Sequence, residues 1–392
     1  MATPPDGASK KSGLAVSKLI LSGANIAWTG TVGRGGHIMY ALQWLHGLRL
    51  LGHEVLYYDR VDDRPETAAL FGAIVERWWD RRFAAALRKN GQSAFGLSLA
   101  HVEAFASDAA GIISLGCQFS ADPDPWLASV RPRVLIDVDP GFSQLWAMEA
   151  SSPEEVLGRH DLYFTVGANV GTTRSALPTL GIDWRPIWNP VITEWWKPEA
   201  PVNRDRFTTI AGLWLNGYQP FDGVVWGPKA EELRRFLRLP KLAGESIEIA
   251  VESGSGEEMM REVAHNGWLI ESAELLASSP EAYREYVTAS AGEFSCAKGL
   301  YVGSRSGWFS DRSACFLAAG RPVVIQDTGI QDLLPTGAGL FAVATVEEAA
   351  EAIRRIRMDY AHHSNIARRI ALNHFDARRV LPGLLEAMGV DG

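Results

Sequence analysis

Residues 299–329 read GLYVGSRSGWFSDRSACFLAAGRPVVIQDTG. The apolar run at 299–304 predicts a buried strand, and a small polar loop follows it. Ser310 is a good helix N-cap, so a helix is predicted over 310–319. Gly320 is expected to end this helix. Residues 322–326 are apolar and β-branched, which predicts the next strand. This succession of strand, loop, helix and strand is typical of α/β proteins with parallel sheets.

The loop and the helix start within this stretch form a candidate anion site. The first N–H groups of a helix have no partner inside the helix, and the helix dipole favours negative charge beside them. Gly307 lies in the loop, and the hydroxyl of Ser310 lies at the helix start. Arg305 and Arg312 can add charge-assisted hydrogen bonds to a diphosphate.

Short apolar runs and helical segments alternate along the whole chain, which predicts parallel sheets with crossover helices. The first unit is a run at 18–23, a glycine-rich loop, a helix from 37 to 51 and a run at 54–59. The further predicted strands are 111–116, 133–138, 162–167, 206–213, 247–251, 267–271 and 340–343. The further predicted helices are 64–89, 95–107, 228–238, 256–265, 280–290, 346–358, 361–373 and 377–388.

The pattern divides the chain into two α/β domains. Residues 1–16 are small and polar, which predicts a disordered N-terminus. An N-terminal domain is expected over 17–197, and a Pro-rich polar linker over 198–205. A second domain is expected over 206–375. Residues 376–392 are expected to form a C-terminal helix that packs back on the N-terminal domain. A ligand site of such a protein is expected in the cleft between the domains.

Composition narrows the class of protein. The chain has 392 residues, of which 47% are hydrophobic and 21% charged, and its formal net charge is -8. An acidic chain is a poor match for nucleic acid, which selects clustered Lys and Arg, so no nucleic-acid partner is expected. No apolar run is long enough to predict a transmembrane segment or a signal peptide. The three cysteines are too few for a disulfide framework, which favours a reducing cytoplasm.

Several stretches resemble one enzyme superfamily. The segments GWFS at 307–310 and AAGRPVV at 318–324 resemble the donor-binding region of GT-B glycosyltransferases. FTVGANVG at 164–171 and GIDWRP at 181–186 resemble a bacterial group of glycosyltransferase-like proteins. The resemblance covers most of the chain and is strongest over 295–345. It implies two Rossmann-like α/β/α domains facing across a cleft, and transfer of a sugar from a nucleotide-diphosphate donor.

The resemblance also implies roles for individual residues of the second domain. The diphosphate would be bound by Gly307, Ser310, Arg312, Lys229 and Arg305. The donor sugar would meet a loop after the predicted strand 322–326, formed by Asp327, Thr328 and Gly329. The nucleobase would lie near Trp268 and Ile270. Many members of the superfamily hold the ribose hydroxyls with a glutamate where this chain has Cys315, and a thiol cannot accept two hydroxyl hydrogen bonds as a carboxylate does.

The first domain would present the acceptor. His37 follows the glycine loop at a helix start and is a candidate general base, because its ordinary pKa is near neutral. Asp139 follows a predicted strand and is a second candidate base. Gly35 and Gly36 in the loop would let the acceptor approach. Asp137 and Asp139 form an Asp-x-Asp pair that can suggest a divalent metal, but the pattern is short and common. No tightly required metal or other cofactor is therefore expected.

Other functions remain open from the sequence. A sugar-nucleotide epimerase and a non-catalytic nucleotide-sugar-binding protein have the same fold, and Cys315 favours the latter. A dehydrogenase is a weaker alternative, because the glycines at 30, 33, 35 and 36 lack the dinucleotide spacing, although Asp59 ends the second predicted strand. We expect a monomer or homodimer whose partners are a nucleotide-sugar donor and a small-molecule or peptide acceptor, with a place in natural-product or glycan biosynthesis.

Overall fold

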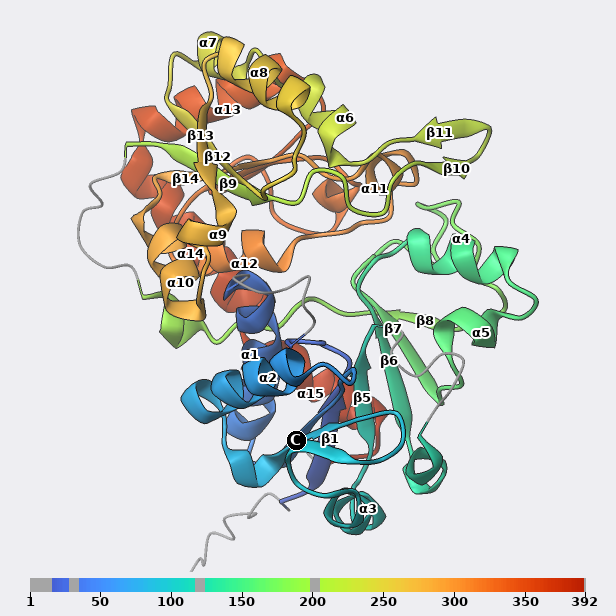
Figure 1. Ribbon diagram of the computed structural model, residues 1–392. Coiled ribbons are helices and arrows are strands. Elements are labelled where there is room, and N and C mark those ends of the chain that lie inside the picture. Colours follow the sequence, from blue (N-terminus) through green and yellow to red (C-terminus); the bar gives the residue numbers. More distant parts are fainter. Residues whose placement is uncertain (1–15, 28–34, 117–123, 198–204, 391–392) are drawn as a thin grey trace, which may run out of the picture.

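Two lobes of α/β structure make up the protein in the computed structural model (Figure 1), which describes residues 16–27, 35–116, 124–197 and 205–390. Three sequence expectations lie outside these residues: the N-terminus before residue 16, the glycines at 30 and 33, and all but the last residue of the linker. No helix in the described ranges is long and apolar enough to cross a membrane.

The first lobe contains an eight-stranded sheet in the order β4-β3-β2-β1-β5-β6-β7-β8. All neighbouring pairs are parallel except β3 and β4 at one edge. The strands are short and mostly buried on both faces, as helix-covered parallel strands must be. They are β1 (Lys18–Ser22), β2 (Glu54–Arg60), β3 (Ala84–Leu87), β4 (Ser93–Gly96), β5 (Ile112–Leu115), β6 (Arg133–Asp137), β7 (Leu162–Thr165) and β8 (Trp184–Pro186).

Helices flank this sheet, and the largest hydrophobic cluster of the lobe joins α1 to the strands. They are α1 (Gly35–Leu50), α2 (Pro65–Trp78), α3 (Leu99–Ser107), α4 (Phe142–Glu149) and α5 (Pro153–Leu157), with 3-10 turns at Arg81–Phe83, Pro125–Ser129 and Thr193–Trp196. The helix expected over 64–89 ends at Trp78. Its alanine-rich end forms β3 instead, because pairing with β2 and full burial override the helix propensity of alanine.

The second lobe contains a six-stranded parallel sheet in the order β13-β12-β9-β14-β15-β16. In chain order this is 3-2-1-4-5-6, the doubly wound arrangement that binds ligands beyond the carboxyl ends of its strands. Its strands are β9 (Phe207–Ala211), β12 (Ile247–Val251), β13 (Leu269–Ser272), β14 (Gly292–Ser295), β15 (Val323–Gln326) and β16 (Leu340–Val343). A separate antiparallel hairpin is formed by β10 (Gln219–Phe221) and β11 (Val224–Trp226).

Helices cover both faces of the second sheet (Figure 1). They are α6 (Lys229–Arg234), α7 (Leu239–Ala243), α8 (Glu257–His265), α9 (Ala273–Leu276), α10 (Pro280–Ala289), α11 (Gly299–Gly303), α12 (Asp311–Ala318), α13 (Val346–Met358) and α14 (Tyr360–His374), with a 3-10 turn at Ile330–Asp332. The last helix, α15 (Ala377–Ala387), packs against α1 of the first lobe, and Leu381, Leu384 and Leu385 are buried in the core there.

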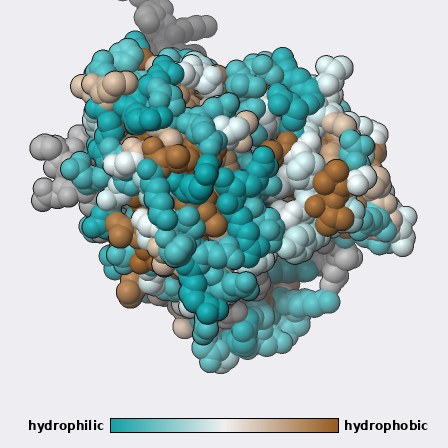
Figure 2. Space-filling view, turned by 90° about the horizontal axis from the view of Figure 1, so that it is seen from above, coloured by the Kyte–Doolittle hydropathy of each residue, from teal (hydrophilic) through white to brown (hydrophobic). Residues whose placement is uncertain are grey.

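The strand expected over 299–304 is wrong, because residues 299–303 form helix α11. The strand of this unit is β14, which ends just before it. Its second residue is Glu293, a fully buried carboxylate that interrupts the apolar pattern by which strands are recognised. The face of the molecule in Figure 2 is mostly hydrophilic with separate hydrophobic patches, one of them on the side from which the β10–β11 hairpin projects.

Candidate active site

A cavity of about 670 Å³ lies between the two lobes. Both lobes contribute to its walls. The lining residues lie at the carboxyl ends of β6, β9, β12 and β13 and at the N-termini of α1, α6, α9 and α12. Of the residues predicted from the sequence, five line it, namely Gly36, His37, Asp139, Lys229 and Arg312. The other lining residues are Tyr40, Val138, Asn189, Ile210, Glu252, Ser253, Ala273, Glu274, Ala277, Tyr283, Lys298, Tyr301, Trp308 and Asp311.

Arg312 forms the cationic wall at the start of α12. Its Nε donates to Oε1 of Glu293 at 2.6 Å, and its Nη2 donates to the hydroxyl of Ser295 at 2.6 Å. Its Nη1 donates to the carbonyl of Ile210 at 2.6 Å. Ser310 caps the helix by accepting the N–H of Arg312, as its sequence position predicts. The guanidinium is therefore fixed at the carboxyl ends of β9 and β14, and two of its five N–H groups are not used in these bonds.

Lys229 adds a second positive charge at the start of α6. The side chain is buried, and this burial lowers its pKa to about 8, with the nearby charge of Arg312 acting in the same direction. Within the described residues no carboxylate lies close enough to form an ion pair with Lys229. A buried cation without a paired anion is costly, so an anion placed next to Lys229 would offset part of this cost.

His37 lies on the opposite wall, in the first turn of α1. Its Nε2 contacts the carbonyl oxygen of Ala24. A carbonyl can only accept, so Nε2 carries a proton and Nδ1 is the acceptor atom of the neutral ring. Asp311, the first residue of α12, also lines the cavity, and desolvation of its carboxyl group raises its pKa.

Asp139 connects the two lobes. Its Oδ1 accepts a hydrogen bond from the ammonium of Lys298 at 2.6 Å and another from the hydroxyl of Tyr301. The neighbouring Asp137 is fully buried and accepts from Ser143, Gln144, Thr165 and the N–H of Asp139. The first aspartate of the Asp-x-Asp pair therefore holds the loop in place. In the described part of the chain no three His, Cys, Asp or Glu side chains form a metal-binding group.

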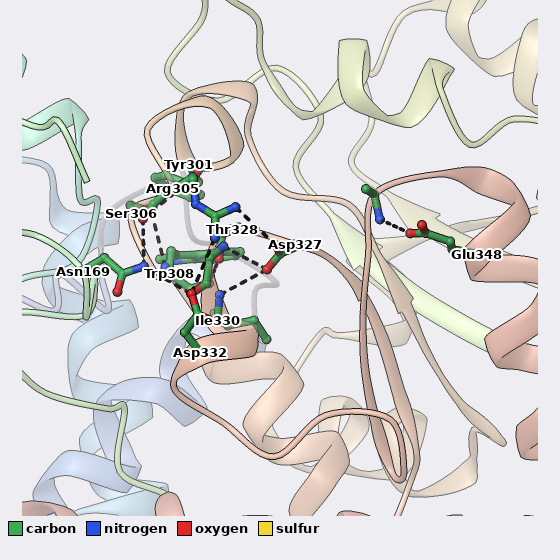
Figure 3. Close-up of polar contacts among 12 residues, drawn as sticks. Asn169, Tyr301, Arg305, Ser306, Trp308, Asp327, Thr328, Ile330, Asp332 and Glu348 are labelled. Atoms are coloured by element: carbon green, nitrogen blue, oxygen red, sulfur yellow. Dashed lines mark hydrogen bonds and ion pairs between the residues drawn. The ribbon is translucent and has the colours of Figure 1, made fainter. Parts of the chain in front are cut away.

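Other sequence-predicted residues, among them Arg305, Asp327 and Thr328, lie close together in two loops of the second lobe (Figure 3). Arg305 lies 3.7 Å from both Asp327 and Asp332, and Asp327 accepts the N–H groups of Gly329 and Ile330. Thr328 donates to the carbonyl of Trp308, and Gly307 donates its N–H to the carbonyl of Thr328. The structure brings the predicted sugar loop and the predicted phosphate loop together, but these residues and Ser310 do not line the cavity.

The first lobe contacts this loop pair directly. Nδ2 of Asn169 donates to the carbonyls of Arg305 and Gly329 at 2.9 and 3.2 Å. The N–H of Asn169 donates to Ser306 at 3.0 Å, and the hydroxyl of Ser175 donates to the carbonyl of Ser304 at 2.7 Å. The 304–308 loop thus receives hydrogen bonds from the opposite lobe.

Three further predicted positions lie away from the cavity wall. Trp268 is buried in the core of the second lobe and donates to the carbonyl of Leu237, and Ile270 packs against the same core. Gly35 packs on the loop before α10, where an added Cβ would lie 2.0 Å from the carbonyl oxygen of Ser279. Cys315 is also buried, next to the side chain of Gln43.

Sequence reasoning missed several residues of the cavity wall. Tyr40 lies one helical turn after His37, and burial raises the pKa of its hydroxyl. Glu252 and Glu274 follow β12 and β13, at the strand ends where ligands of a doubly wound sheet bind. That strand-end position was the available signal for both glutamates. Lys298 had no such signal, because its strand was placed incorrectly.

No family model and no curated protein matches the chain. Solved structures do. An alpha-glucosyltransferase in complex with UDP and a 13-mer DNA containing an HMU base is 11% identical, with a TM-score of 0.58 over 96% of this chain and 100% of that one. Anabaena HepE in complex with UDP and glucose is 15% identical, with a TM-score of 0.54 over 95% and 99%. AviGT4, a glycosyltransferase involved in avilamycin A biosynthesis, is 13% identical, with a TM-score of 0.51 over 95% and 97%.

The chain has the GT-B fold. The match extends over both lobes, because each of these structures covers at least 95% of this chain. The prediction of two Rossmann-like domains in a GT-B arrangement is thereby confirmed. In this GT-B fold the interdomain cavity lies beyond the strand ends of the second sheet, the place where such sheets bind nucleotides.

Proposed function

We propose that the protein is a glycosyltransferase that moves a sugar from a nucleoside-diphosphate donor to a hydroxyl or other nucleophile of a small-molecule or peptide acceptor. The observation that carries the proposal is the cationic wall of the interdomain cavity, formed by Lys229 and Arg312 at two helix starts. Anions bind at such helix starts. UDP is present in the alpha-glucosyltransferase and HepE structures that share the fold, which makes a uridine nucleotide the first candidate.

The arrangement supports a division of labour between the domains. Lys229 and Arg312 would stabilise the charge that develops on the departing diphosphate, which lowers the barrier to breaking the bond to the sugar. His37 would accept the proton of the acceptor at Nδ1. Asp139 is already bonded to Lys298 and Tyr301, so in this arrangement its contacts favour a role in holding the domains together. A closed cavity would exclude water and so limit hydrolysis of the donor.

Thermal unfolding with and without nucleotides tests the proposal. The panel is UDP, GDP, dTDP, ADP, CMP and NAD, each with and without EDTA. We expect one nucleoside diphosphate at 100 times its dissociation constant to stabilise the protein by about 2.7 kcal/mol, with or without EDTA. Lys229→Met should abolish this shift. Lys229 is a better target than Arg312, whose removal would leave the buried charge of Glu293 without its partner.

The matched control is Lys241→Met, which changes an exposed lysine of α7 and should leave the shift unchanged. Stabilisation by none of the nucleoside diphosphates, or by NAD alone, would contradict the proposal. For a sugar nucleotide that binds, product analysis with candidate acceptors separates the possible reactions. Transfer releases the nucleoside diphosphate, whereas an epimerase returns an intact sugar nucleotide with altered sugar.

A further inference from the structure

Charge is distributed unevenly along the wall that the second domain gives to the cavity. The cations Lys229 and Arg312 lie at the starts of α6 and α12, and Arg312 is bonded to residues of β9 and β14. Two carboxylates, Glu252 and Glu274, follow β12 and β13 on the other side of β9. A ligand that fits both ends has an anionic part and a part rich in hydroxyl or N–H donors.

Glu252 occupies a defined position at the carboxyl end of the sheet. It directly follows β12, the second strand of the 3-2-1-4-5-6 sheet, and lies beside the end of β9. A Cβ added to Gly212, just after β9, would lie 3.0 Å from Oε1 of Glu252, so this carboxylate approaches the backbone at that point. In dinucleotide-binding sheets of this strand order, an acidic residue after the second strand binds ribose hydroxyls, and Glu252 occupies the corresponding strand end here.

Glu274 supports the loop that carries Glu252. Its Oε1 accepts the N–H of Ser253 at 2.6 Å, and its Oε2 accepts the hydroxyl of Ser272 at 2.9 Å. The hydrogen bond from Ser253 is the main cause that lowers the pKa of Glu274 to about 2. Glu274 therefore holds the loop as a permanent anion, while the chain beyond Glu252 turns back through hydrogen bonds from Ser255 to the Glu252 carbonyl.

The helix position that would otherwise supply a hydroxyl acceptor is not available. The side chain of Cys315 is 1% exposed, lies in a hydrophobic cluster and contacts Gln43. Its thiol therefore does not reach the cavity. Trp268 and Ile270 belong to the core behind the sheet. Among the described residues of this wall, the carboxylates at the cavity are Glu252, Glu274 and Asp311, and Asp311 lies at the start of α12 with Arg312.

We infer that Glu252 accepts hydrogen bonds from the ribose hydroxyls of the bound nucleotide, with Glu274 as the residue that positions its loop. The inference rests on the proposed function, because it requires a nucleoside diphosphate in this cavity. It also orients the ligand: the diphosphate lies against Lys229 and Arg312, and the nucleoside extends over the ends of β12 and β13.

Titration calorimetry on the full chain tests this assignment with pairs of ligands that differ by one hydroxyl. The probes are UDP and its 2′-deoxy form, with GDP and ADP and their deoxy forms as further pairs. We expect the wild type to prefer the ribose form by about 10- to 100-fold, the effect of a hydrogen bond to a charged acceptor. Glu252→Ala should bring the ratio close to one while binding through the phosphates persists. Glu252→Gln should give an intermediate ratio.

The ratio is the informative quantity, because removing a negative charge near a diphosphate also changes the affinity for both ligands of a pair. Glu258→Ala, an exposed glutamate of α8, is the control and should keep the wild-type ratio. An unchanged ratio in Glu252→Ala, or no preference in the wild type, overturns the role of Glu252 and leaves the proposed function standing. Failure of every nucleoside diphosphate to bind contradicts the proposed function itself.

Discussion

Lys229 is the single residue whose chemistry most directly reports on the cavity. Burial lowers its pKa to about 8, so its charge changes within an accessible pH range. The folded protein holds this proton less tightly than the unfolded chain, where the pKa is close to the ordinary value of 10.5. The stability contributed by neutral Lys229 is therefore fully present above pH 10.5 and is lost as the pH falls through about 8.

Binding of a diphosphate should show the opposite pH dependence, because the anion favours the charged form of Lys229. We expect the affinity for the stabilising nucleoside diphosphate to stay constant near pH 7 and to fall above pH 8, by up to about tenfold per pH unit. Titration calorimetry between pH 7 and pH 9.5 measures this decline. Binding should also take up protons, which calorimetry in buffers of different ionisation enthalpy detects.

Lys229→Met is the control for this dependence. It should bind the nucleotide weakly and with no decline over the same pH range. Without ligand it should be more stable than the wild type at pH 7 by about 1–3 kcal/mol, because the cost of burying the charge is removed. A wild-type affinity that stays flat through pH 9 would show that the ammonium of Lys229 does not meet the diphosphate.

At the residue scale the sequence pointed to part of the cavity wall. His37, Asp139, Lys229 and Arg312 follow strand ends or lie at helix starts, positions that a parallel sheet brings to one edge, and all four line the cavity. The sequence could not show that the loop at Arg305 meets the other domain, because that contact depends on how the domains pack. The placement of those loops at the interface is therefore visible only in the folded chain.

The element that fixes Arg312 is strand β14. Glu293 on this strand is fully buried and pairs with Arg312 at 2.6 Å. A buried ion pair of this kind contributes little net stability compared with a hydrophobic pair, but removing one partner leaves an uncompensated charge. The pair therefore holds helix α12 against the sheet. It contributes more to the position of the Arg312 guanidinium in the cavity wall than to the free energy of unfolding.

Single and double substitutions of this pair should have different effects. We expect Arg312→Met or Glu293→Leu alone to lower the free energy of unfolding by about 3–5 kcal/mol. The double variant with both changes should recover much of this loss, because an apolar pair replaces the buried charges. It should still lack the stabilisation by nucleotide, because the guanidinium is gone. Urea unfolding with and without the nucleotide measures both quantities.

The outcome of the double variant separates two roles. Recovery of stability without recovery of nucleotide binding means that Arg312 acts on the ligand. Recovery of both would mean that Arg312 serves only to neutralise Glu293, and the cationic wall would then consist of Lys229 alone. Arg234→Met is the matched control, because it breaks ion pairs with the partly exposed Glu231 and Glu262 and should cost less than about 1 kcal/mol.

The bounds of helices and strands were predictable from the sequence where the hydrophobic periodicity is clear, and not at β14. The helix α13 and the strands β12 and β16 have the bounds expected from their patterns, because their hydrophobic periodicity is clear. Strand β14 is short and contains Glu293, so the neighbouring apolar residues 299–303 were taken for the strand. A buried charge whose partner lies on a distant helix cannot be recognised from a local pattern.

At the scale of the whole molecule, the sequence predicted two α/β domains but not the contacts that hold them together. The alternation of elements and the polar segment near 198–205 indicate the division. The contacts across it depend on single side chains in loops. Asp139 pairs with Lys298 and Tyr301, and Asn169 bonds to the backbone carbonyls of Arg305 and Gly329.

Asn169 should stabilise the closed arrangement of the domains. Its side chain is fully buried, and its Nδ2 donates to carbonyls that belong to two loops of the second domain, at Arg305 and Gly329. Asn169→Ala would leave both carbonyls without this donor. We expect it to open the cleft, which small-angle X-ray scattering should detect as a larger radius of gyration in the absence of ligand. A bound nucleoside diphosphate should reverse part of this increase, because it bridges the closed cavity.

Asn266→Ala distinguishes an effect on domain closure from an effect on stability. Asn266 donates to the carbonyl of Glu262 within the second domain, so its loss removes a hydrogen bond without touching the interface. Asn266→Ala should keep the wild-type radius of gyration with and without nucleotide. Turnover should fall in Asn169→Ala more than in Asn266→Ala, because an open cleft admits water and separates His37 from the donor. Equal scattering curves for the wild type and Asn169→Ala would show that the remaining contacts, led by Asp139 with Lys298, are sufficient to hold the domains closed.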